Sequence, residues 1–130
     1  FSSRGLGDVY KRQDSGPNML VDSIADTAWC GGVVLGGNPV RLNDIDIRRI
    51  GGSLSINGEI IETGSAVAVM SNPVNAVAWL ANTLLRFGTS IQPGDVILSG
   101  SFVRAVPFEA DQSLVALFDG LGEVTLKVAP

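Results

Sequence analysis

The stretch NPVNAVAWLANTLLRFGTSIQPGDVILSGS, residues 72–101, decides the fold of this chain. Its first half predicts an amphipathic helix over 73–87, because apolar residues recur every three or four positions. Asn72 is a good N-cap, and Gly88 is a common residue just past a helix end. Pro73 falls at the first helical position, where its missing N–H removes no hydrogen bond. The stretch therefore predicts one long helix with both ends marked.

The second half of the stretch predicts a turn, a strand and a polar loop. The sequence QPGD (92–95) is typical of a tight turn, and VIL (96–98) predicts a short buried strand. This strand leads into Ser99-Gly100-Ser101, two hydroxyls on either side of a glycine. Backbone N–H groups and a ligand can approach each other closely at such a glycine. This loop is the best candidate for a functional site.

The rest of the chain adds a shorter helix and several strands. Asn57-Gly58 accepts the positive φ that a type I′ turn needs, so a hairpin is expected over 50–62. The sequence predicts an α+β, β-rich domain. Its other expected elements are a helix over 19–28 and strands over 33–35, 65–70, 102–106, 113–118 and 124–128.

The bulk properties restrict the class of protein. A chain of 130 residues, 45% hydrophobic and 17% charged, is at most one ordinary globular domain. No apolar run approaches the roughly 20 residues of a membrane span, so we expect no membrane partner. The net charge of −4 argues against nucleic acid as a partner. A single cysteine, Cys30, excludes an internal disulfide and fits a cytoplasmic location.

The first thirteen residues, FSSRGLGDVYKRQ, differ from the rest of the chain. They carry three basic residues and one acidic residue, whereas residues 14–130 carry six basic and twelve acidic residues. The segment lacks apolar periodicity and resembles translated sequencing-adapter DNA. We therefore expect residues 1–13 to be non-native and disordered, and the domain to begin upstream of residues 14–130.

Missing residue types exclude several chemistries. The chain has no histidine, so it cannot form a Ser-His-Asp triad, a Cys-His pair or a histidine-ligated zinc site. Gly31-Gly32 and Gly36-Gly37 lack the spacing of a phosphate-binding glycine loop. Asp22 and Asp26 fall four residues apart on the first helix and could act as an acid and base or bind a metal. An exposed helix face is the simpler explanation for that pair.

Several motifs occur in an order that resembles a known family. They are Ile24-Ala25-Asp26, Asn57-Gly58-Glu59, WLANTL (79–84), PGDVILSGS (93–101), Val106-Pro107 and GLGEV (120–124). Together they resemble the C-terminal part of the fumarylacetoacetate hydrolase superfamily, over roughly Met19 to Val128. Within it, the chain is most similar to the 2-keto-4-pentenoate hydratases and the related 4-oxalocrotonate decarboxylases. The resemblance implies a mixed, rolled β-sheet, with residues 14–130 forming the C-terminal portion of one catalytic domain.

The resemblance also implies substrate-binding residues. In the family, the loop matching Ser99, Gly100 and Ser101 lines the substrate pocket, where its donors suit a carboxylate or 2-oxo group. The alternative is a strand-end turn whose hydroxyls cap the backbone. Asp26 matches a family aspartate near the pocket. Thr27 stands where the family has asparagine, and Trp29 replaces a serine that faces the substrate.

The family binds a divalent cation, Mg²⁺ or Mn²⁺, through a Glu-x-Glu pair and a third acidic residue. No Glu-x-Glu occurs in this sequence, so no metal ligand is assigned and the ligands are expected upstream. The resemblance implies a metal-dependent, homo-oligomeric hydratase of small 2-oxo or 2-hydroxydienoate acids. A decarboxylase of the same family and a non-catalytic assembly domain are the alternatives. Without a metal site, residues 14–130 alone are expected to be inactive.

Overall fold

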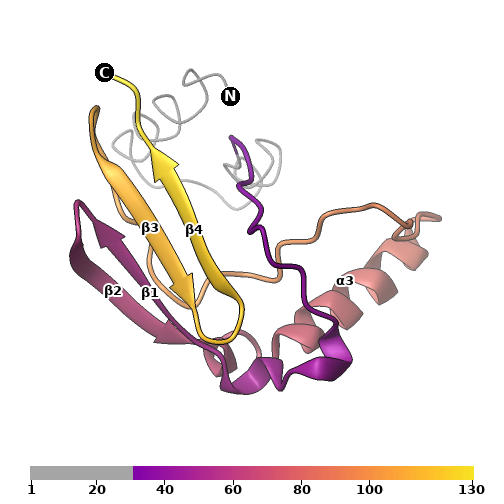
Figure 1. The fold of residues 1–130 in the computed structure, drawn as a ribbon. Helices are drawn as coiled ribbons and strands as arrows, with labels where there is room; N and C mark the ends of the chain where they lie inside the picture. Colours follow the sequence, from indigo (N-terminus) through magenta and orange to yellow (C-terminus); the bar gives the residue numbers. More distant parts are fainter. Residues whose placement is uncertain (1–30) are drawn as a thin grey trace.

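The structure is a computed structural model that describes residues 31–130. The expected helix over 19–28 and the expected disorder of 1–13 lie outside the described residues. The α+β class is confirmed, because one long helix, α3 (Pro73–Arg86), accompanies a four-stranded sheet (Figure 1). Among residues 31–130, no helix has both the length and the apolar character needed to span a membrane.

The sheet consists of β1 (Gly51–Ile56), β2 (Glu59–Ser65), β3 (Ser113–Phe118) and β4 (Gly122–Lys127), in the order β2-β1-β3-β4. All three pairings are antiparallel. The described sheet is therefore not mixed, contrary to the prediction. Two hairpins with short turns supply the outer pairings, and short turns can join only antiparallel strands. The two hairpins then meet along β1 and β3, again in opposite directions.

The turn between β1 and β2 confirms the hairpin prediction. Asn57 has φ 51° and Gly58 has φ 85°, as a type I′ turn requires. The Asn57 side chain has a second role, because its Oδ1 accepts a hydrogen bond from the Ser113 N–H at 2.9 Å. The same residue therefore closes the hairpin and fixes the start of β3 beside it.

A β-bulge in this hairpin changes which residues face each other. Leu54 pairs with Glu62 but Ser55 pairs with Ile60, so Ile61 is the extra residue on β2. Beyond the bulge, Gly52 pairs with Gly64 on one side and with Phe118 on the other. The bulge therefore creates a cross-strand row of two glycines and a phenylalanine on one face of the sheet.

The two faces of the sheet differ in composition. The face that holds this row is apolar, and Leu114 on it is buried. Its other apolar members are Leu54, Ile56, Ala116, Val124 and Leu126. The opposite face mixes Val115 and Leu117 with serines, threonines, Glu123 and Lys127. The apolar face is the one that other segments cover.

A second small core of the described residues lies where three of their short 3₁₀ helices meet the start of α3. These helices are η2 (Leu42–Asp44), η3 (Ile47–Arg49) and η4 (Ala66–Ala68). The buried residues there are Ile50, Ala66, Val69 and Pro73. The Ala66 N–H donates to the Ile50 carbonyl at 2.8 Å, which joins the end of β2 to the segment before β1.

Four predicted strands are wrong. Residues 33–35, 96–98 and 102–106 have no strand partner, and after Ser65 the chain forms η4 instead of a strand. Gly36 and Phe102 lie over the apolar face. Gly36 lies close to Val124, and Phe102 lies close to Gly52 and Gly64. Chain that covers a face cannot extend the ladder at an edge, so these segments stay outside the sheet. Val33, Val34, Leu35, Val96 and Leu98 are exposed within the described residues, so the expected burial of 96–98 is also wrong. The predicted strands over 113–118 and 124–128 are confirmed as β3 and β4.

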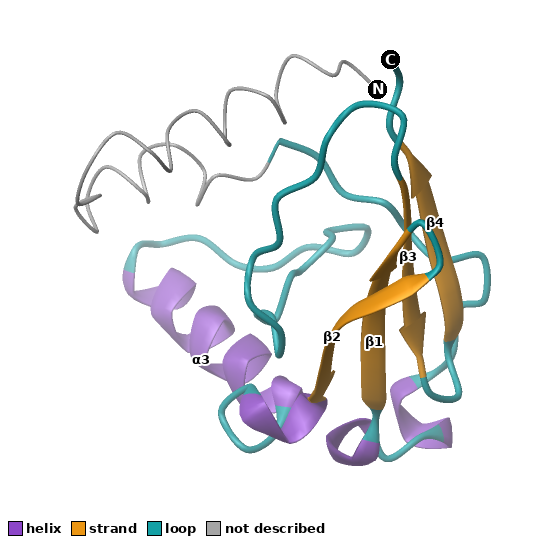
Figure 2. Ribbon diagram, turned by 90° about the vertical axis from the view of Figure 1, so that its left-hand side faces the viewer, coloured by secondary structure: helices purple, strands orange, loops and turns teal. Residues whose placement is uncertain are grey.

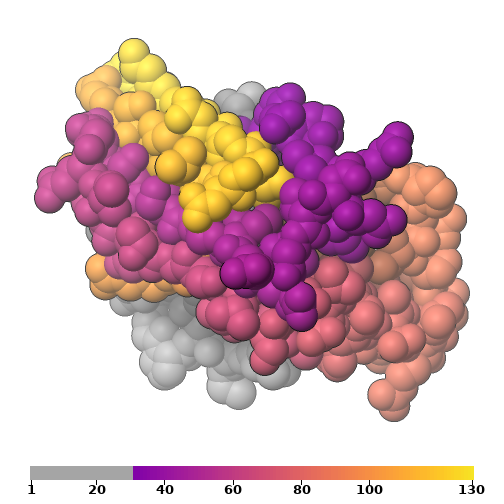
Figure 3. All heavy atoms as spheres, turned by 60° about the horizontal axis from the view of Figure 1, so that its bottom comes forward, coloured from indigo at the N-terminus to yellow at the C-terminus, as the bar shows by residue number. Residues whose placement is uncertain are grey.

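The helix prediction is confirmed to within one residue at its end. Asn72 Oδ1 accepts from the Val74 N–H at 3.0 Å, and Gly88 has φ 72° just past the last turn. Figures 1 and 2 show α3 beside the sheet, with coil segments between them. The space-filling view places the indigo segment 31–50 between β4 and the helix (Figure 3). Trp79 and Phe87 are 59% and 80% exposed, so neither belongs to a core within residues 31–130.

The N-cap of α3 gives a first testable prediction. We expect Asn72→Ala to lower the free energy of unfolding by about 1 kcal/mol, because the Val74 N–H loses its acceptor. Asn82→Ala is the matched control, since Asn82 is exposed within the same helix. Urea unfolding measures both variants, and equal stabilities would contradict the capping role.

The Asp46–Arg48 pair predicts a pH effect. Arg48 Nε and Nη2 each donate to a different oxygen of Asp46 at 2.8 Å. The hydrogen bonds from Arg48 lower the pKa of Asp46 below its ordinary value of 3.8. A lowered folded-state pKa stabilises the protein above the unfolded value, and this contribution is lost as the pH falls through the folded value.

We therefore expect Asp46→Asn to lower stability slightly at pH 7 and to flatten the loss of stability below pH 4. The effect is small because both side chains are solvent-exposed. Thermal unfolding at pH 7 and at pH 3 measures it. Asp44→Asn is the control, and an identical pH response in both variants would refute the assignment.

Candidate functional site

The Ser99-Gly100-Ser101 loop is part of the long coil between α3 and β3. Ser99 is half-buried, whereas Gly100 and Ser101 are exposed. Gly100 has φ 115°, a left-handed conformation that favours glycine. Glycine is therefore favoured at this position, where the backbone bends between the two serines.

The two hydroxyls of the loop differ in their hydrogen bonds. Ser101 Oγ donates to the Val103 carbonyl at 2.6 Å and accepts from the Val103 N–H at 3.3 Å. This matches the alternative in which a hydroxyl caps the backbone. Among the described residues, Ser99 Oγ has no hydrogen-bond partner. Ser99 is therefore the hydroxyl of the loop that is available to a ligand.

One side of the loop contacts the segment that leads into α3. A Cβ placed on Gly100 would lie 3.3 Å from Val69 Cγ1. Two successive residues after Val69 have left-handed backbones, Met70 with φ 49° and Ser71 with φ 62°. The Asn75 side chain donates to the Met70 carbonyl at 3.0 Å and supports this unusual link. The predicted strand over 65–70 is absent after Ser65, and no local sequence signal indicates this contact.

The other side of the loop is fixed by Phe102. Its ring lies over Gly52 and Gly64 and makes an edge-to-face contact with Phe118, with ring centroids 6.0 Å apart at 89°. We call Gly52, Gly64 and Phe118 the glycine socket. Phe102 falls in the predicted strand over 102–106, and the sequence indicates no role for the two glycines. The bulge that aligns them has no clear signal in the sequence.

Arg104, considered as a possible contact for an anionic substrate, is paired with Glu62 of β2. The Arg104 side chain is 76% exposed, whereas that of Glu62 is 20% exposed. The coil therefore continues past Phe102 over β2, and Arg104 already has a carboxylate partner there. Together, Phe102 and Arg104 attach the coil to the sheet at two neighbouring points.

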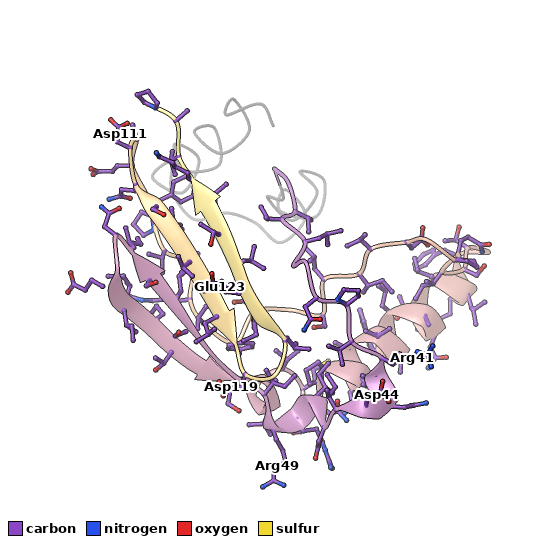
Figure 4. All side chains as sticks on the ribbon, in the orientation of Figure 1. Arg41, Asp44, Arg49, Asp111, Asp119 and Glu123 are labelled. Atoms are coloured by element: carbon purple, nitrogen blue, oxygen red, sulfur yellow. The ribbon has the colours of Figure 1, made fainter. Side chains whose placement is uncertain are left out.

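The described residues do not fit a divalent metal. Residues 31–130 contain no group of three or more acidic, cysteine or histidine side chains that could hold an ion. Figure 4 shows why, since Asp111 and Asp119 lie at opposite ends of the sheet and Asp44 lies beside α3. Divalent cations such as Mg²⁺ need several converging oxygen ligands. Asp26, the remaining predicted site residue, lies outside the described residues.

Gly100 gives a prediction that separates strain from contact. We expect Gly100→Ala to lower the free energy of unfolding by about 2 kcal/mol through its left-handed φ. The new methyl group would also displace Val69 and so move the loop against α3. Gly94→Ala is the control, because Gly94 has φ 98° but open space around it. Urea unfolding should show a larger loss of stability for Gly100→Ala than for Gly94→Ala, and equal losses would contradict the contact with Val69.

Known proteins resemble this chain in both sequence and structure. It is 37% identical over 111 residues to 2-oxo-hept-4-ene-1,7-dioate hydratase of Escherichia coli, covering 85% of this chain and 42% of that protein. It is 41% identical over 103 residues to 2-keto-4-pentenoate hydratase of Burkholderia vietnamiensis, covering 79% and 39%. No protein-family model matches the chain.

The structure agrees with these sequence matches. It resembles 4-oxalocrotonate decarboxylase from Pseudomonas putida G7, complexed with magnesium and adipate, with a TM-score of 0.79 and 32% identity. The match covers 83% of this chain and 41% of the decarboxylase. The chain is thus related to enzymes that hydrate or decarboxylate small unsaturated acids. It is a homologue of the 2-keto-4-pentenoate hydratases and 4-oxalocrotonate decarboxylase, and it spans about two fifths of their length.

Proposed function

We propose that this chain is the C-terminal part of a divalent-metal-dependent hydro-lyase that hydrates 2-hydroxypenta-2,4-dienoate-type acids. The observation that carries the proposal is the similarity to hydratases over about four fifths of the chain. The free hydroxyl of Ser99 supports it, since a hydroxyl can donate to the carboxylate or 2-oxo oxygen of such an acid. In this proposal Ser99 binds and orients the substrate, and Gly100 gives the loop its bend.

We further propose that the described sheet is part of the rolled β-sheet of the fumarylacetoacetate hydrolase superfamily. Many large apolar side chains of residues 31–130 are exposed, and patches of this kind usually contact other protein. The more exposed of them are Leu35, Ile60, Val67, Met70, Trp79, Leu85, Phe87, Val96 and Leu98. In our proposal, the remainder of the domain and neighbouring copies in a cytoplasmic homo-oligomer cover these side chains.

The metal of this proposal is bound outside residues 31–130, because the described residues do not provide a ligand set. Decarboxylase structures that resemble this chain were solved with magnesium and adipate or with calcium and acetate. These complexes support a divalent cation, and we propose Mg²⁺ or Mn²⁺ as that cation. We expect residues 14–130 alone to show no hydratase activity.

The second candidate is decarboxylation of 4-oxalocrotonate. It is favoured by the similarity to 4-oxalocrotonate decarboxylase, both in sequence, at 33% identity over 108 residues, and in structure. A non-catalytic assembly domain is the third candidate. Trp29, which replaces a serine of the resembled family, is the residue that favours it.

The full-length protein distinguishes the three candidates. We would extend the gene upstream, purify the protein with Mg²⁺, and assay 2-hydroxypenta-2,4-dienoate and 4-oxalocrotonate in parallel. Hydration of the dienoate that is lost with EDTA supports the first candidate. Carbon dioxide release from 4-oxalocrotonate without dienoate turnover supports the second. If the protein turns over neither acid, the result supports the third candidate, a non-catalytic assembly domain.

Two serine variants test the role of the loop in the active protein. Ser99→Ala should raise KM for the dienoate about tenfold, because one hydrogen bond to a charged group contributes about 1.5 kcal/mol or more. Ser101→Ala is the comparison, since its hydroxyl is already bonded to both backbone groups of Val103, and it should change KM less than Ser99→Ala does. An unchanged KM for Ser99→Ala would remove Ser99 from the substrate site.

A further inference from the structure

We infer that Phe102 is a positioning residue, which fixes the Ser99–Ser101 loop by binding its ring in the glycine socket. The effect of Phe102 on substrate binding rests on the proposed function. The packing of its ring rests only on contacts between segments that are far apart in the sequence. Phe102 touches no substrate in this proposal and acts only through the loop that precedes it.

The socket is shaped to receive the ring. A Cβ placed on Gly52 would lie 2.8 Å from Cζ and 3.0 Å from Cε2 of Phe102. A Cβ placed on Gly64 would lie 2.7 Å from Cδ2 of the same ring. Real Cβ atoms do not approach other carbons so closely, so only glycine leaves room at both positions. Phe118 closes the third side with its edge-to-face contact. The ring therefore has one defined place on the apolar face.

The ring fixes the loop directly, because the two are adjacent in the chain. Phe102 follows Ser101 directly, and the Ser101 hydroxyl is hydrogen-bonded to both backbone groups of Val103, on the far side of the ring. On the near side, Gly100 contacts Val69. The loop is therefore fixed at both ends, by the socket and by the segment before α3, while Ser99 Oγ remains free. A ring that leaves the socket would release one of these two ends.

Trypsin cleavage of the full-length protein tests the anchor without any substrate. Arg104 is two residues beyond Phe102, and its exposed side chain makes it a cleavage site once the coil opens locally. Phe102→Leu should accelerate cleavage after Arg104 about tenfold relative to cleavage after Arg86, at the end of α3. Phe108→Leu is the matched control, because Phe108 is a half-buried phenylalanine of the same coil. Mass spectrometry follows the two cleavages in one sample.

A second variant leaves Phe102 intact. Gly52→Ala fills the socket from β1 and should accelerate cleavage after Arg104 in the same way, with Gly37→Ala as its control. In the active holoenzyme, Phe102→Leu should raise KM for the dienoate about fivefold while kcat changes less than twofold, since a displaced loop weakens substrate binding first.

The outcomes separate this inference from the proposed function. Equal cleavage rates after Arg104 in Phe102→Leu, Phe108→Leu and the unchanged protein overturn the anchor, whatever the enzyme does. Faster cleavage with an unchanged KM overturns the link to substrate binding. If the full-length protein turns over neither acid, the proposed function fails, and the cleavage comparison still decides whether Phe102 fixes the loop.

Discussion

Gly64→Ala should lower the free energy of unfolding by about 3 kcal/mol, at the upper end of what overpacking usually costs. A methyl group at Gly64 would overlap the carbonyl oxygen of Phe102 as well as its ring. A ring can rotate away, but a backbone carbonyl moves only with its segment. The coil over β2 must therefore shift, and the Arg104–Glu62 pair shifts with it.

Gly37→Ala is the matched control for this variant, because a Cβ at Gly37 meets nothing within 4 Å. Its effect should stay within about 0.5 kcal/mol, as for most surface substitutions. Urea unfolding of the full-length protein measures both. Similar losses for Gly64→Ala and Gly37→Ala would show that Phe102 does not pack against β2 as described.

Leu114→Ala should have a comparable effect of about 3 kcal/mol, because it leaves a cavity under a buried side chain. Leu114 is 9% exposed on the apolar face of β3, next to Ile56 and Leu126 of the neighbouring strands. Those neighbours belong to different strands and cannot easily collapse together. The lost packing is therefore not recovered by relaxation.

Leu117 provides the comparison for Leu114 on the same strand. It has the same side chain but lies on the opposite face and is 46% exposed. Leu117→Ala should lower stability by less than about 1 kcal/mol. The two leucines are an odd number of residues apart, so a register shifted by one residue would reverse the result. A larger loss for Leu117→Ala would contradict the described faces.

Local signals explain most of the successful predictions. The cap at Asn72, the stop at Gly88 and the Asn57-Gly58 turn each depend on residues within a few positions of one another. Their φ values and hydrogen bonds are as expected. The failed strands at 33–35, 96–98 and 102–106 are short runs rich in apolar residues, and a run of this length does not by itself show whether the segment pairs in a sheet.

For the candidate site, too, the sequence predicts some features and the tertiary contacts decide others. The Ser99-Gly100-Ser101 loop could be selected from its residue types and its place after an apolar run. The difference between the two hydroxyls could not, because it depends on whether Val103 turns back toward Ser101. The contacts of Gly100 with Val69 and of Phe102 with two strands join segments about thirty to fifty residues apart. No periodicity in the sequence records them.

By itself, the sequence determined the α+β class, the helix at 73–86, the type I′ hairpin and the relationship to the hydratases and decarboxylases. These follow from short-range chemistry and from motifs in a fixed order. Only the tertiary structure decided that Gly52 faces Gly64. An unbulged hairpin would place Thr63 opposite Gly52, and the single extra residue Ile61 shifts the partner by one. That shift leaves room for Phe102, because a threonine side chain there would occupy the place of the ring.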